Sequence, residues 1–165
     1  MPSSSSNSVK AQFDFQTRLF NNVTEGISDS ESQVRSVANI NNIKWVAGHM
    51  LDARLNMMSK VAGLTPDDSY GAQFRRGTVL DPNASYPSIE EITSKWKTVS
   101  ATLSESLGNM AEGVLSSKAP FESPIFNIDH SIHGMLLFLL THEAMHIGQL
   151  SILRKMAGKE AMSFR

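Results

Sequence analysis

The stretch Ile132–Leu153, IHGMLLFLLTHEAMHIGQLSIL, decides the fold of this chain. Its apolar residues recur near the helical period, and His142 and His146 continue the same stripe. The apolar members of the stripe are Ile132, Met135, Leu136, Leu139, Met145, Leu150 and Leu153. This pattern predicts a helix that turns the stripe, with its two basic side chains, into the core of a bundle. A polar group buried in this way needs a partner, and a metal ion is the partner that we favour.

The spacing of His142 and His146 suits two ligands of one metal ion. On a helix, side chains four residues apart are turned by about 40° and separated by roughly 6 Å along the axis. Both imidazoles can therefore reach one ion through metal–nitrogen bonds of about 2.0–2.1 Å. His133, nine residues before His142, falls on the opposite face of the helix, and His130 is placed at the helix start.

A third histidine comes from another predicted helix. The apolar pattern from about Ile43 to Val61 predicts a helix whose inward face includes His49. His49 is the one remaining histidine of the five that can meet the pair. The sequence therefore predicts a divalent metal site made of His49, His142 and His146.

Three neutral imidazoles that leave a coordination position open are typical of catalytic rather than structural zinc. An ion held in this way lowers the pKa of a bound water or thiol, which favours hydroxide or thiolate chemistry near neutral pH. Asp52 and Glu143 are the carboxylates that we expect to orient the imidazoles. Gln149, one turn beyond His146, is a further side chain predicted beside the site.

Two more helices complete the predicted fold. Apolar positions from Val9 to Ile27 predict a first amphipathic helix, and the capping box Ser88–Glu91 begins a third. Asp129 is placed as the N-cap of the last helix. The connections at 65–85 and 116–127 are long enough to cross the end of a bundle. The sequence thus predicts an all-α fold, a four-helix bundle with long crossover connections.

Length and composition limit the chain to one domain. We predict a disordered Ser-rich tail at residues 1–8 and a single domain at residues 9–165. A formal net charge of -1 gives no basic surface for nucleic acid or anionic lipid, and the absence of cysteine excludes disulfides and thiolate ligands. The start of the chain lacks the apolar core of a signal peptide, and the longest apolar run is far shorter than a membrane span. We therefore expect a cytoplasmic protein.

The letters of residues 142–146 also match the zinc-peptidase pattern H-E-x-x-H, in which Glu143 would be the general base. The extended pattern requires a glycine and then a histidine further along, where this chain has Gln149 and Ile152. A glutamate ligand is the other option, but the only acid after the motif is Glu160, close to the end of the chain. We rank a zinc peptidase below the site of three histidines.

Two segments of the chain resemble the DinB-like superfamily. They are NIKWVAGHMLD at residues 42–52 and HEAMHIGQL at residues 142–150, the latter followed by Arg154. Members of this superfamily are four-helix bundles with a metal-binding histidine on the second helix and a His-x-x-x-His pair on the last. The resemblance implies that His49, His142 and His146 are the metal ligands, the same three residues that helix phase selects.

The resemblance also implies an activity. Relatives include thiol transferases that use bacillithiol or mycothiol, a maleylpyruvate isomerase and members described as hydrolases. The resemblance implies zinc or nickel, a low-molecular-weight thiol as a candidate second cofactor, and a homodimer. We expect a metal-dependent enzyme that activates a thiol or water for transfer to, or hydrolysis of, a small molecule. The alternative is a metal-binding bundle without catalysis, serving as a sensor or interaction module, and a fully coordinated, buried ion would favour it.

Overall fold

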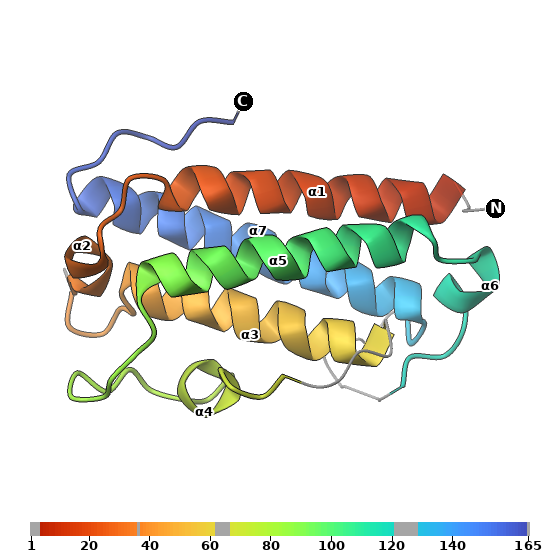
Figure 1. Ribbon diagram of the computed structural model, residues 1–165, viewed down its shortest axis with the longest axis horizontal. Helices are drawn as coiled ribbons and strands as arrows, with labels where there is room; N and C mark the ends of the chain where they lie inside the picture. The colour runs from red at the N-terminus through yellow and green to blue at the C-terminus, as the bar shows by residue number, and fades with distance from the viewer. Residues whose placement is uncertain (1–3, 36, 62–66, 121–128, 165) are drawn as a thin grey trace.

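Four long helices lie side by side along the length of the molecule (Figure 1). The computed structural model describes residues 4–35, 37–61, 67–120 and 129–164. The long helices are α1 (Ser4–Thr24), α3 (Ile43–Val61), α5 (Ile89–Gly108) and α7 (Ile132–Met156). Three short helices lie between them: α2 (Asp29–Gln33), α4 (Gly71–Phe74) and α6 (Glu112–Leu115). Across these ranges there is no strand beyond one isolated bridge, between Lys118 and Ser131, and the prediction of an all-α fold is confirmed.

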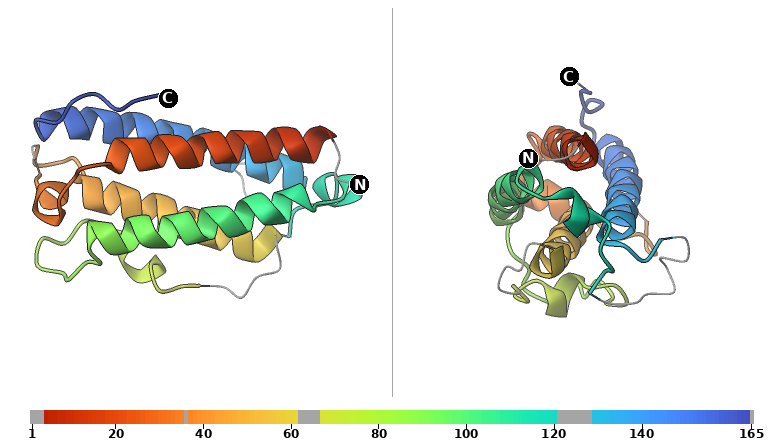
Figure 2. Two further views of the ribbon diagram at one scale, coloured as in Figure 1. Left: turned by 45° about the horizontal axis from the view of Figure 1, so that its top comes forward. Right: turned by 90° about the vertical axis from the view of Figure 1, so that its right-hand side faces the viewer.

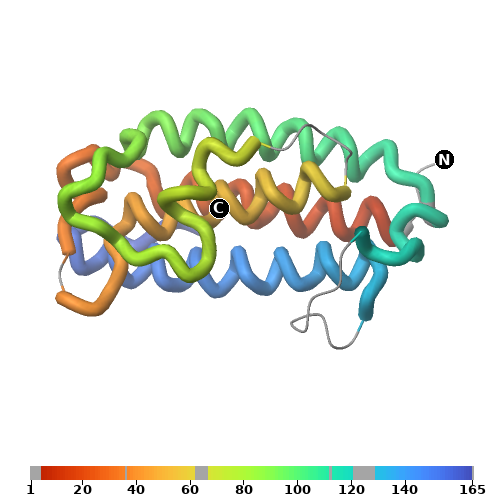
Figure 3. The backbone as a smooth tube through the Cα atoms, turned by 90° about the horizontal axis from the view of Figure 1, so that it is seen from below, coloured from red at the N-terminus to blue at the C-terminus, as the bar shows by residue number. Residues whose placement is uncertain are grey.

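The order of the long helices includes one crossover. α1 and α7 run in one direction and α3 and α5 in the other, and residues 67–88 return along the outside of α3 to reach α5 (Figures 1 and 3). Seen from the end, the helices form a square in which α1 packs against α5 and α7, and α3 packs against the same two (Figure 2). The antiparallel neighbours α3 and α7 are the helices that carry the three histidines.

Capping side chains explain where two of the long helices begin. Ser88 accepts a hydrogen bond from the Glu91 backbone N–H while the Glu91 carboxylate accepts one from the Ser88 N–H, so the predicted capping box at α5 is confirmed. The Asn42 side-chain oxygen accepts the Trp45 backbone N–H at 2.9 Å and caps α3 in the same way. This cap fixes the first turn of the helix that presents His49.

The N-cap of α7 is Ser131, not the predicted Asp129. The Ser131 hydroxyl accepts the Gly134 backbone N–H at 3.0 Å, whereas the Asp129 carboxylate accepts the Ser131 N–H at 2.8 Å. Asp129 therefore closes the turn that leads into the helix, and the prediction was two residues early. Both residues have the short polar side chain that caps require, so sequence alone does not separate them.

The first helix begins earlier than the sequence predicts. Residues 4–8, predicted as part of a disordered tail, form the first turns of α1, and Ser6 is fully buried. Packing of α1 beside α6 and α5 outweighs the weak helix propensity of serine in this stretch.

Helix α7 is apolar around most of its circumference. By length and composition alone, it is the one helix in the described ranges that could cross a membrane. It is also a core helix of the bundle, packed against α1 and α3, and core helices meet the same criteria.

Candidate metal centre

The structure brings His49, His142 and His146 together between α3 and α7. The Nε2 atom of His142 lies 3.1 Å from the Nε2 of His49 and 3.1 Å from the Nε2 of His146. The ring centroids are 4.4 to 5.0 Å apart, and the rings meet edge to face. Within the described part of the chain, this is the one cluster of three or more side chains with metal-ligating atoms close enough to share an ion.

The separations of the His142 Nε2 from the other two Nε2 atoms fit one metal ion. For metal–nitrogen bonds of about 2.0–2.1 Å, two ligands at angles between octahedral and tetrahedral lie about 2.9–3.4 Å apart. The two separations of 3.1 Å fall within that interval. His49 and His146 are 8% and 9% exposed, and His142 is half-buried, so a cation there would be largely screened from water by its ligands.

Burial keeps the pair on α7 in the ligand form. Desolvation lowers the pKa of His142 to about 3, with smaller contributions from the neighbouring His146 and His49. Desolvation also lowers the pKa of His146, against the opposing effect of its hydrogen bond with Gln149. Both imidazoles are therefore neutral at physiological pH, and a metal ion does not have to displace a proton from either ring.

Two of the rings are fixed through their second nitrogen. The Nδ1 of His49 is 2.6 Å from the carbonyl oxygen of Phe74, and the Nδ1 of His146 is 2.7 Å from the side-chain oxygen of Gln149. An oxygen can only accept, so each Nδ1 donates its proton and leaves the Nε2 lone pair directed at the shared point. The Nδ1 of His142 is buried and has no hydrogen-bond partner within the described ranges.

The partner of His49 comes from a segment that the sequence did not single out. Phe74 ends the short helix α4, is fully buried, and its ring lies against Gly48 of α3. A Cβ at position 48 would come within 2.4 Å of that ring, so the close approach of α4 to α3 requires glycine there. A main-chain carbonyl has no sequence signature, and only this glycine beside a histidine hinted at the contact.

Asp52 pairs with an arginine, and the Nδ1 of His49 contacts the Phe74 carbonyl instead of this carboxylate. The Asp52 side chain is 5% exposed and lies 3.4 Å from the guanidinium of Arg75, which also pairs with Asp68. Burial raises the pKa of Asp52, and the charge of Arg75 opposes that rise. The prediction placed Asp52 from helix phase alone, which did not anticipate an arginine from the crossover segment.

Glu143 was predicted beside the imidazoles or as a general base, and the structure places it elsewhere. Both of its oxygens accept hydrogen bonds from Arg54, at 2.8 and 2.6 Å, and both side chains are 0% exposed. Residue 143 is turned about 100° from His142 on the helix, far enough to face the centre of the bundle. The Glu143 carboxylate is thus the counterion of the buried Arg54 guanidinium and is not accessible to solvent.

Arg54, on α3, contacts each of the other three long helices. From α3 it reaches Glu143 on α7, Thr17 on α1 at 2.8 Å and Ser100 on α5 at 2.6 Å. Its guanidinium also lies 3.7 Å from the centre of the Trp96 ring. Each guanidinium nitrogen of Arg54 therefore donates at least one hydrogen bond. A charged group is tolerated in a protein core only when it is paired and hydrogen-bonded in this way.

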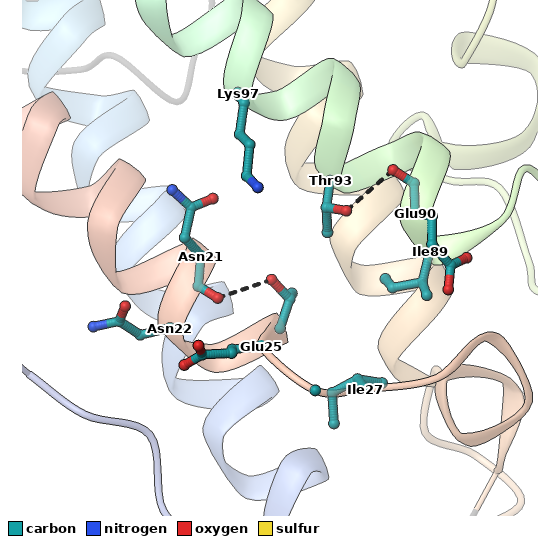
Figure 4. A pocket seen from close by; sticks show the side chains of 10 residues that line it. Asn21, Asn22, Glu25, Ile27, Ile89, Glu90, Thr93 and Lys97 are labelled. Carbon is teal, nitrogen blue, oxygen red and sulfur yellow. Dashed lines mark hydrogen bonds between the residues drawn. The ribbon is translucent and has the colours of Figure 1, made fainter.

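A cavity of about 400 Å³ adjoins the cluster, with His146 and Gln149 in its wall. Trp45, also in the wall, stacks on the His49 ring with a centroid distance of 5.3 Å. Figure 4 shows a different cavity, of about 330 Å³, between the end of α1 and the start of α5. Charged Glu25, Glu90 and Lys97 line that second cavity, and none of the three histidines does.

Comparison with known proteins gives the family of the chain. The family model described as the DinB superfamily matches residues 12–150, a segment that includes all three histidines. No curated protein matches the sequence significantly.

Proposed function

The chain belongs to the DinB superfamily, and from this membership and the histidine cluster we propose that it is a metal-dependent enzyme acting on a small molecule. The observation that carries the proposal is that the Nε2 of His142 lies 3.1 Å from the Nε2 of both His49 and His146, with one ligand atom of each ring within 4.8 Å of the others. Neutral nitrogens facing each other at this distance repel unless a cation or proton lies between them. Three protein ligands leave a further position for water or substrate, the arrangement typical of catalytic sites.

His49, His142 and His146 would hold the ion, and their immediate partners would keep the rings in place. When bound, the ion supplies a positive charge that lowers the pKa of a bound thiol or water. Phe74 and Gln149 fix the tautomers of His49 and His146, so that no proton occupies the Nε2 atoms of these two rings. Zinc and nickel are both suited to three imidazoles.

Thiol transfer is the reaction that we favour over hydrolysis with a carboxylate base. A water attack assisted by a general base requires a carboxylate within about 3 Å of that water. Glu143 is occupied by Arg54 and has no exposed surface, and Asp52 is paired with Arg75. This arrangement counts against the H-E-x-x-H peptidase mechanism. A thiol whose pKa a bound ion would lower could release its proton to solvent, and would not need a carboxylate at this position.

Metal titration of purified variants tests the proposal. We expect the chain to bind one equivalent of zinc or nickel in competition with a chromophoric chelator, and His142→Ala to lose that binding. His133→Ala is the matched control, because His133 lies on the same helix near Asp129, in the lining of a different cavity. Equal metal content in the two variants would overturn the proposed site. A screen of thiols against alkyl and aryl halides then tests the thiol-transfer step.

A further inference from the structure

The cavity beside His146 has a lining without formal charge. Its apolar walls include Trp45, Ile40, Ile152 and Met156, and its polar atoms come from amide side chains such as Gln149. None of the described residues in the lining is Asp, Glu, Lys or Arg.

The cavity and the histidine cluster share residues. His146 forms part of its wall, and Gln149, in the same wall, accepts the Nδ1 proton of that ring. The indole of Trp45 has its ring nearly parallel to the His49 imidazole, at an interplanar angle of 10°. A molecule in the cavity therefore touches the side chains that position two of the three proposed ligands.

Several large apolar side chains at the rim of the cavity are exposed to solvent. Ile152 is 64% exposed, Ile40 46% and Met156 43%, and all three belong to the lining. Clustered apolar side chains around a concavity mark ligand-binding surfaces more often than they mark ordinary solvent-facing surface. A volume of about 400 Å³ lies within the range of small-molecule sites.

We propose that this cavity binds the uncharged, apolar part of the substrate, such as an aromatic or branched aliphatic group, beside the metal centre. This inference rests on the proposed function and adds the substrate class. In the metal-free protein, an ionised carboxylate or ammonium in the cavity would lose water without gaining an opposite charge from the lining, so charged molecules are disfavoured there. Gln149 and the neighbouring Asn41 offer amide groups to a hydroxyl, carbonyl or amide on the ligand.

A pair of fluorescent probes tests the charge preference in the metal-free protein. N-phenyl-1-naphthylamine is uncharged, and 8-anilinonaphthalene-1-sulfonate is its sulfonated counterpart with a similar ring system. We expect the uncharged probe to bind with enhanced fluorescence and the sulfonate to bind roughly tenfold more weakly or worse. Equal affinity for the two probes, or tighter binding of the sulfonate, would overturn the proposal.

Two variants locate the binding site. Ile152→Asp places a charge on the rim at a position already exposed, and we expect it to weaken binding of the uncharged probe by roughly tenfold or more. Val79→Asp, at a position 81% exposed and outside the lining, is the matched control and should bind like the parent chain. Unchanged binding in Ile152→Asp, or loss of binding in Lys97→Ala of the second cavity, would overturn the assignment.

Two further measurements separate this inference from its alternatives. The zinc affinity of the same samples reports on the metal centre independently. Zinc binding without probe binding would overturn the assignment of the cavity as a ligand site and leave the proposed metal centre standing. Sedimentation velocity tests whether a second copy covers the rim. A parent dimer that Ile152→Asp converts to monomers would show that the rim is an interface, and would overturn the ligand site.

Discussion

At the scale of single residues, the orientations of the His49 and His146 rings depend on the oxygen atoms that their Nδ1 atoms contact. His49 depends on a main-chain oxygen of Phe74, which stays in place only while the Phe74 ring can rest on the bare Cα of Gly48. His146 depends on a side chain one turn along its own helix. The proposed ligand from α3 is therefore sensitive to the packing of α4, whereas a proposed ligand from α7 is supported locally.

Gly48→Ala should weaken metal binding through this contact. The added Cβ would meet the Phe74 ring at 2.4 Å, so α4 must move and take with it the carbonyl that holds His49. We expect the free energy of unfolding to fall by about 1–3 kcal/mol and zinc affinity to fall by about tenfold or more. Urea unfolding and zinc titration measure the two effects.

Gly148→Ala is the control for that experiment. It lies on α7 with no atom within 4 Å of an added Cβ, so only helix propensity should change. We expect it to stabilise the chain by about 0.5–1 kcal/mol and to leave zinc affinity unaltered. If Gly48→Ala also kept full zinc affinity, the Phe74 carbonyl would not be positioning His49.

At the scale of helices, the buried pair of Arg54 and Glu143 holds α3 in register with α7. Glu143 follows His142 directly, and Arg54 lies five positions after His49, so the same two helices carry both the pair and the histidines. A two-point contact between planar groups tolerates little sliding or rotation of one helix against the other. The pair therefore sets the spacing of the histidines although it touches none of them.

Replacing both charges tests this role separately from stability. Glu143→Gln alone leaves a buried guanidinium without its counterion and should cost about 3–5 kcal/mol. Arg54→Met combined with Glu143→Leu fills the space with apolar atoms, and we expect its stability to return to within about 2 kcal/mol of the parent chain. We nevertheless expect zinc affinity to stay about tenfold below the parent value, since the register contact is gone.

The surface pair of Lys10 and Asp14 on α1 provides the control, because Lys10→Gln combined with Asp14→Asn should change neither quantity measurably. Parent-like zinc affinity in the apolar double variant would show that core packing alone keeps the register.

The direction in which Glu143 points could not be predicted from the sequence. Phase placed residue 143 near the histidines, but α7 buries more than one face, and only the neighbouring helix reveals which face meets Arg54.

At the scale of the whole molecule, most of the architecture could be predicted. The apolar periodicity of Ile132–Leu153 and of 43–61 predicted the helices of the cluster, and the length of the 65–85 connection allowed the crossover that α4 now occupies. Short helices such as α4 lack a periodicity of their own, since a single turn cannot display one. Serines at 4–8 read as a tail because their burial depends on neighbours far along the chain.

A bound ion should act as a cross-link of the whole bundle. His49 and His142 are 93 residues apart in sequence and belong to different helices, so an ion that binds both is held only by the folded chain. A ligand of the folded state alone adds about 2.7 kcal/mol to the free energy of unfolding at a hundredfold excess over its dissociation constant. For a chain of this size we expect zinc to raise the melting temperature by roughly 5–10 °C and a chelator to reverse the rise. His49→Ala should show no such rise, as measured by circular dichroism, because it lacks the ligand from α3. A rise that persists in His49→Ala would mean that zinc stabilises the bundle without joining α3 to α7.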